Sequence, residues 1–114
     1  MQIQINTDRH IQGDEALAAE VRGVVEAALS RASDHITRVE VHLSDQNGDK
    51  SGHIDKRCVM EARLEGRQPV AVTHQAATLG EAVDGAADKL SRLVESRLSR
   101  LHDQRQRTTD PFPP

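Results

Sequence analysis

Four stretches of the chain alternate apolar and polar residues, the period-two pattern of strands with one buried face. The first lies at residues 2–6, and the second and third are "ITRVEVHL" and "KRCVMEARLEG". The second and third strands are predicted to bury Thr37, Val39, Val41 and Leu43, and Cys58, Met60, Ala62 and Leu64, respectively. The fourth stretch, "RQPVAVTHQ", follows a tight turn near Gly66. The pattern therefore predicts four strands, of which the last three are consecutive.

Two further stretches repeat apolar residues at spacings of three and four, as amphipathic helices do. The first spans about residues 14–32, and either Gly13 or Asp14 can cap its free backbone amides. The second follows Thr78, which forms a capping-box sequence with Glu81, and is predicted to span about residues 79–102. Such a helix would be roughly 36 Å long at 1.5 Å per residue. Because a small sheet needs less cover than that, the C-terminal end of the helix is expected to project.

The resulting order is strand, helix, three strands, helix. Because alternating strands have one covered face and one solvated face, both helices are expected on the same side of the sheet. We therefore predict an α+β fold, a β-α-β-β-β-α two-layer sandwich with a four-stranded, mainly antiparallel sheet. One domain is expected over residues 1–103, and a disordered tail over residues 104–114, which are polar and then proline-rich.

Composition narrows the class of protein. With 36% hydrophobic residues, 29% charged residues and a net charge of −3, the chain is typical of a small soluble domain. It begins with "MQIQIN", unlike a signal peptide, and its single cysteine cannot form an internal disulfide, so a cytoplasmic location away from membranes is expected. It has one Phe and neither Trp nor Tyr, so any RNA binding is expected to depend on charge and shape rather than on base stacking.

Charge is distributed unevenly along the chain. Residues 1–87 include 9 basic and 14 acidic residues, whereas residues 88–107 include 6 basic and 3 acidic residues. The basic excess on the last helix favours either a phosphate-binding surface or a solvated face with local ion pairs, such as Asp88 with Arg92. Positive charge near a helix C-terminus also suits the helix dipole.

The same helix carries a family resemblance. Its sequence "AVDGAADKLSRLVESRLSRL" resembles the A-x-D-x-x-x-D-K-L-x-R signature of the bacterial ribosome hibernation promoting factor and ribosome-associated inhibitor (Y protein) family. "GDEALAAEV" resembles the start of that family's first helix, and the resemblance covers residues 1–101. It implies a fold related to double-stranded RNA-binding domains. It also implies a non-enzymatic protein that binds the small ribosomal subunit through rRNA phosphates and silences ribosomes under stress.

The resemblance also implies which residues contact rRNA. They are Lys89, Arg92, Arg97 and Arg100 on the last helix, and Arg22 on the first. Four phosphate contacts would give the binding constant a salt dependence with a slope of about −3 to −4. The chain resembles the short form of the family, without the dimerising domain of the long forms.

One departure from the family pattern leaves alternatives open. The first helix of the family is usually basic, whereas here two arginines stand against three glutamates. The chain is therefore either a ribosome-binding inhibitor or a protein-interaction module with the same fold that has lost rRNA binding. A weak homodimer through the projecting helix end is a third alternative.

No other group of residues predicts an enzyme, a cofactor site or a metal site. The loop "SDQNGDKSGHID" alternates oxygen-bearing side chains, but it has lysine where a calcium loop needs Gly and Glu. The six histidines are scattered, and a zinc site needs three or four convergent ligands. Cys58 is expected to be a buried, inert thiol.

Overall fold

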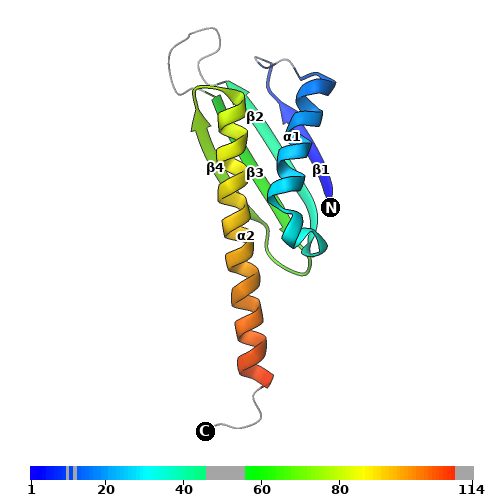
Figure 1. Ribbon diagram of the computed structural model, residues 1–114, viewed down its shortest axis with the longest axis vertical. Helices are drawn as coiled ribbons and strands as arrows, with labels where there is room; N and C mark the ends of the chain where they lie inside the picture. The colour runs from blue at the N-terminus through cyan, green and yellow to red at the C-terminus, as the bar shows by residue number, and fades with distance from the viewer. Residues whose placement is uncertain (10, 12, 46–55, 110–114) are drawn as a thin grey trace.

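The computed structural model describes residues 1–9, 11, 13–45 and 56–109, with side chains as far as Arg100. Four strands form one sheet in the order β1-β2-β3-β4, and two α-helices cover the same face of it (Figure 1). The strands are β1 Gln2–Thr7, β2 Ile36–Asp45, β3 Lys56–Leu64 and β4 Val70–Ala76. The helices are α1 Glu15–Ala28, the short 3-10 helix η1 Ser30–His35 and α2 Leu79–Thr109. The predicted fold class and element order are confirmed.

The sheet is mixed. β2 pairs with β3, and β3 with β4, in antiparallel fashion, whereas β1 runs parallel to β2. A parallel pair needs a crossover connection, which α1 supplies. The register places Ile3 opposite Val39 and Ile5 opposite Val41, so the apolar residues of β1 extend the covered face.

The core lies between the sheet and the two helices. Its fully buried residues include Val39, Val41, Met60 and Ala62 from the strands, and Val21, Val25, Leu90 and Val94 from the helices. The inward set predicted for the third strand is confirmed. In the second strand the prediction for Thr37 is wrong, because a register irregularity between Ile36 and Arg38 turns Ile36 inward and leaves Thr37 exposed.

Both helix starts have side-chain caps. The Asp14 carboxylate accepts a hydrogen bond from the Leu17 amide at 2.8 Å. The Thr78 hydroxyl oxygen accepts from the Glu81 amide at 3.2 Å, and the hydroxyl donates to the Glu81 carboxylate at 3.0 Å. These bonds satisfy amide groups that a helix start leaves without intrahelical partners.

The helix ends differ from the sequence prediction. α1 ends at Ala28, and η1 occupies the residues that follow. α2 continues to Thr109, so the predicted end near His102 is wrong, and residues 104–109, expected in the tail, are helical. The chain has no glycine or proline between Gly85 and Pro111 to stop the helix. Residues 110–114 of the predicted tail lie outside the described residues. Within the described part of the chain, no helix is both long and apolar enough to cross a membrane.

Candidate nucleic-acid interface

The helix α2 has two parts. Over residues 79–94, here called the sheet-bound half, it buries Ala82, Val83, Ala86, Ala87, Leu90 and Val94. Over residues 95–109, here called the projecting half, it passes the end of the sheet (Figure 1). Leu98, one turn beyond Val94, is only half-buried. Full burial of the helix therefore ends at Val94, and Leu98 packs against the core only in part.

Each predicted cation on the sheet-bound half has a partner within the protein. The Lys89 ammonium donates a hydrogen bond to the Thr73 carbonyl at 3.0 Å. Because β4 is an edge strand, this bond covers part of an otherwise open sheet edge. The Arg92 guanidinium lies 3.2 Å from the Asp88 carboxylate, and both side chains are exposed. Lys89 thus has a structural role, and Arg92 belongs to a surface ion pair, which contributes little to stability.

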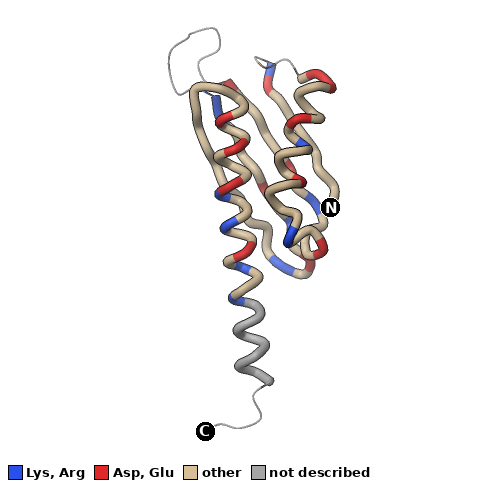
Figure 2. Tube along the Cα trace, viewed as in Figure 1, with Lys and Arg blue, Asp and Glu red and all other residues tan. Residues whose placement is uncertain are grey.

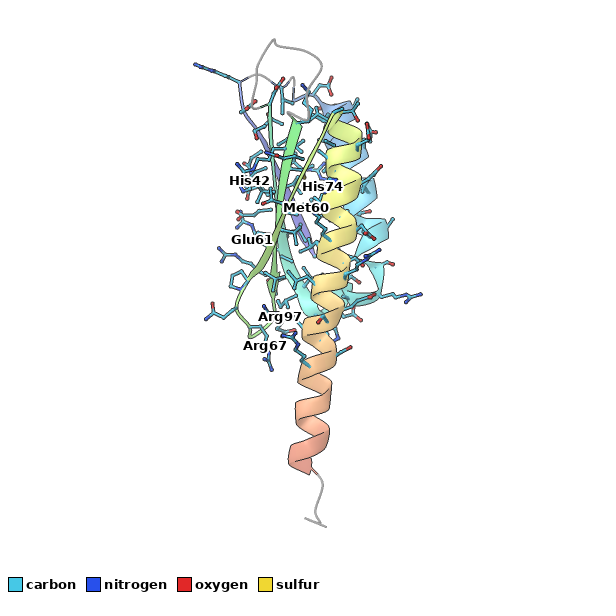
Figure 3. All side chains as sticks on the ribbon, turned by 90° about the vertical axis from the view of Figure 1, so that its left-hand side faces the viewer. His42, Met60, Glu61, Arg67, His74 and Arg97 are labelled. Carbon is cyan, nitrogen blue, oxygen red and sulfur yellow. The ribbon has the colours of Figure 1, made fainter. Side chains whose placement is uncertain are left out.

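The cations of the projecting half lie in a different setting. Arg97 and Arg100 line a hollow of about 270 Å³ together with Arg67 and Gln68 from the turn between β3 and β4. The apolar part of its lining is formed by Leu64, Val70 and Leu98. Figure 3 shows Arg67 and Arg97 together at the end of the sheet where α2 leaves it. We call this hollow the hairpin pocket.

Local backbone geometry explains why these arginines meet. Gly66 has a φ of 68°, in the left-handed region that glycine adopts readily, and the Arg67 amide donates to the Leu64 carbonyl at 3.1 Å. The turn therefore fixes the backbone of Arg67. On α2, Arg97 follows Leu90 and Val94 at spacings of four and three, so it continues the inward stripe. Because the sheet has ended there, the arginine reaches the turn.

In the described part of the chain, the positive charge of the hairpin pocket has no anionic partner. Four other described cations do have one, for example Arg38 with Glu40 at 2.9 Å and Lys56 with Asp45 at 3.0 Å. Among the described residues, no hydrogen bond or ion pair involves the side chains of Arg67, Arg97 or Arg100. Figure 2 shows the change along α2, from acidic residues at its start to basic residues where it leaves the sheet. Guanidinium groups in this state are suited to phosphate oxygens.

Arg22, the predicted contact on α1, lies apart from the other four. It lines a separate hollow with Ile5, Thr7 and Asp14, where α1 meets β1. Between the two helices lies a groove of about 100 Å³ with an apolar lining, to which Glu20 and Asp84 add negative charge. The helices therefore do not form a cationic clamp. The structure brings Arg97 and Arg100 together, and it separates them from Arg22.

Sequence reasoning missed Arg67 and Gln68. It assigned both to the fourth strand, whereas β4 begins at Val70. Pro69 was the available signal, because proline cannot donate a ladder hydrogen bond and is rare inside strands. A second signal was Arg97, a charged residue on the stripe that buries Leu90.

The described histidines and the cysteine do not come together as a second site. His42 is exposed on β2, whereas His74 is half-buried on the face that α2 covers. A Cβ atom added at Gly85 would lie only 2.1 Å from the His74 ring, so the ring fills the space that this glycine leaves. Cys58 is fully buried, and loss of solvation raises the pKa of its thiol to about 12. The prediction of a buried Cys58 is confirmed, and a thiol with such a pKa has little nucleophilic thiolate at neutral pH.

Metal ligands do not converge in the described part of the chain. There, no three His, Cys, Asp or Glu side chains are placed to share an ion. The loop at residues 44–55 was compared with a calcium-binding loop from its sequence. Its residues 46–55 lie outside the described part of the chain.

Comparison with known proteins identifies relatives. A family model described as Sigma 54 modulation protein / S30EA ribosomal protein matches residues 3–102. The structure is similar to the Protein Y N-terminal domain of Thermus thermophilus, with a TM-score of 0.69 and 26% identity over 84% of this chain and 98% of that one. It is also similar in fold to a ribosomal subunit interface protein from Coxiella burnetii, with a TM-score of 0.67 and 18% identity over 87% and 99% of the two chains. No curated protein matches the chain.

Proposed function

The chain belongs to the Sigma 54 modulation protein / S30EA ribosomal protein family of ribosome-associated factors, and we propose that it binds the small ribosomal subunit through rRNA phosphates and inhibits translation under stress. Family membership confirms the resemblance seen in the sequence. The observation that carries the finer proposal is the uncompensated arginine group of the projecting half, Arg97 and Arg100 with Arg67 beside them.

Phosphate is the RNA group that this surface fits best. A guanidinium presents several N–H donors in a fixed plane and can hold two phosphate oxygens at once. The chain has one Phe and neither Trp nor Tyr, so it is poor in the aromatic side chains on which RNA readers usually stack bases. Contacts would therefore be mainly to the RNA backbone, with binding that follows the shape of the folded rRNA more than its sequence.

The fold presents these charges in a fixed position. The sheet-bound half anchors α2 through Leu90 and Val94, both fully buried, so the arginines just beyond it need little ordering when RNA binds. Inhibition would follow from occupancy alone. A domain seated between the head and body of the subunit, as the family resemblance implies, would exclude mRNA and tRNA without any chemical step.

One feature favours a second candidate, a protein-interaction module. The groove between α1 and α2 is apolar and carries Glu20 and Asp84, so a basic amphipathic segment of another protein would complement it. Binding of this kind would not use the arginines of the projecting half.

Co-sedimentation with purified small ribosomal subunits tests the primary proposal. We expect binding at low salt that weakens towards about 0.3 M salt, with a slope of about −1.5 to −2 for the phosphate contacts of Arg97 and Arg100. Absence of binding at low salt would exclude the proposal. Binding that hardly changes with salt would exclude the phosphate contacts and would favour a protein–protein attachment.

A further inference from the structure

The hairpin pocket has a composition that a phosphate contact alone does not require. It joins three arginines to an apolar surface made by Leu64, Val70 and Leu98. Among the residues whose side chains the structure describes, no aspartate or glutamate lines it. A simple electrostatic contact with an RNA backbone needs the charges but has no use for an apolar surface beside them.

The size of the pocket limits what it can hold. Its volume is about 270 Å³, just below the roughly 300–1,000 Å³ of most small-molecule sites. This volume suits a phosphate with the sugar or base attached to it, and it is too small for a longer oligonucleotide. Gln68 at its rim offers both a donor and an acceptor to the polar edge of such a group.

We infer that the hairpin pocket is a nucleotide-binding site, in which Arg67, Arg97 and Arg100 hold the phosphate and the apolar surface contacts the attached sugar or base. An unstacked nucleotide of rRNA and a free nucleotide present this same chemistry. The rRNA form of the inference rests on the proposed function, whereas the free-nucleotide form does not. Arg67 is the residue that distinguishes this site from a helix-only RNA contact, because it comes from the turn between β3 and β4.

Heteronuclear NMR of the full chain tests the site directly. The probes are adenosine monophosphate, adenosine and inorganic phosphate, and the reporters are the backbone amides of Gln68, Val70 and Leu98. We expect saturable shifts of these amides with adenosine monophosphate. Adenosine and inorganic phosphate should each bind about tenfold more weakly, because each lacks one part of the recognised group.

Two matched variants locate the binding. Arg67→Gln should weaken adenosine monophosphate about tenfold, the size expected for loss of one charge-assisted contact. Arg63→Gln removes the same charge from the same hairpin, but Arg63 is exposed on the opposite face of the sheet, near Glu61, and should leave binding unchanged. Both residues are exposed, so neither change should affect folding, which unchanged spectra elsewhere in the chain would verify. Absence of shifts at these amides in millimolar nucleotide, or equal binding by Arg67→Gln and wild type, would overturn the inference.

Co-sedimentation of the same variants separates the two sources of nucleotide. If rRNA supplies it, Arg67→Gln should weaken subunit binding about tenfold relative to Arg63→Gln, and adenosine monophosphate should compete with the subunit. If the ligand is a free nucleotide, both variants should co-sediment as wild type does, while only Arg67→Gln loses adenosine monophosphate.

The two proposals can fail separately. A wild-type protein that binds adenosine monophosphate but no subunit would refute the proposed function and support the pocket. A protein that binds subunits equally well in both variants, and that ignores adenosine monophosphate, would refute only the pocket.

Discussion

The two halves of α2 both contain leucine and basic residues but use them differently. In the sheet-bound half, Val83, Leu90 and Val94 are buried, and the cations Lys89 and Arg92 have partners on the protein. In the projecting half, Leu98 is half-buried, and Arg97 and Arg100 line the hairpin pocket with no anionic partner among the described side chains. The position of the sheet, rather than the residue types, makes this difference.

The comparison also separates stability from binding. A helix in water is marginal unless one face packs, so the sheet-bound half supplies most of the energy that holds α2 in place. The projecting half is then available for a ligand, since none of its described side chains, as far as Arg100, is buried. Substitutions in the two halves should therefore have different consequences.

The largest effect is expected from truncating the core. Leu90→Ala removes a fully buried side chain and should lower the free energy of unfolding by about 3 kcal/mol. Leu98→Ala, in the projecting half, should cost less than about 1.5 kcal/mol because Leu98 is only half-buried. Urea denaturation measures both values. Equal losses would show that the projecting half is packed as firmly as the sheet-bound half.

The next effect concerns subunit binding and follows from the proposed function. The double change Arg97→Glu with Arg100→Glu should weaken co-sedimentation about a hundredfold, because it removes two phosphate contacts and adds repulsion. The matched control is Lys89→Glu with Arg92→Glu, which alters the net charge equally but acts on cations that already have partners. We expect the control to weaken binding less than about tenfold. Equal losses would mean that binding follows net charge and not the location of the arginines.

Much of the fold could be predicted because strand periodicity depends on simple alternation. The inward residues of β3, from Cys58 to Leu64, follow from it directly. The irregularity at Ile36 could not be predicted, because one extra residue reverses the alternation without leaving a glycine or proline in the sequence. The end of α2 was placed too early because the polar composition of residues 103–109 was taken as disorder.

The candidate site was predictable only in part. Arg97 and Arg100 came from the family resemblance, whose signature sequence lies on a single helix. Arg67 is 30 residues away from Arg97 in the chain, and only the hairpin turn brings them to one pocket. Sequence periodicity describes one element at a time, so it could not group residues from different elements. It also could not show that Lys89 is engaged by the edge of β4.

A smaller effect tests how closely the sheet-bound half approaches the sheet. Gly85→Ala should lower the free energy of unfolding by about 2 kcal/mol, because the added methyl group would overlap the His74 ring. Gly23→Ala in α1 is the matched control. No atom lies within 4 Å of its Cβ position, so it should instead raise stability by about 0.5–1 kcal/mol. Adding His74→Ala should recover part of the loss at Gly85. A stabilising Gly85→Ala would mean that α2 is free to move away from β4.

The smallest effect reports on how well the sheet-bound half excludes water. Burial raises the pKa of the Cys58 thiol from 9.0 to about 12, so the folded protein holds its proton where the unfolded chain releases it. Below pH 9 the thiol is protonated in both states, and its contribution to the free energy of unfolding is fully present. This contribution is lost as the pH rises from 9 towards 12, because only the unfolded chain then releases the proton. At pH 10 the loss should be about 1.4 kcal/mol, and Cys58→Ala should remove that part of the pH dependence.

Thiol labelling extends this test to the comparison of the two halves. If the halves are independent, Arg97→Glu with Arg100→Glu should leave the labelling rate of Cys58 unchanged at neutral pH. Leu90→Ala should raise that rate, because the thiol reacts only when the protein opens, and a less stable protein opens more often. Faster labelling in the arginine variant would instead show that the projecting half helps to hold α2 on the sheet, and the separation of stability from binding would then be wrong.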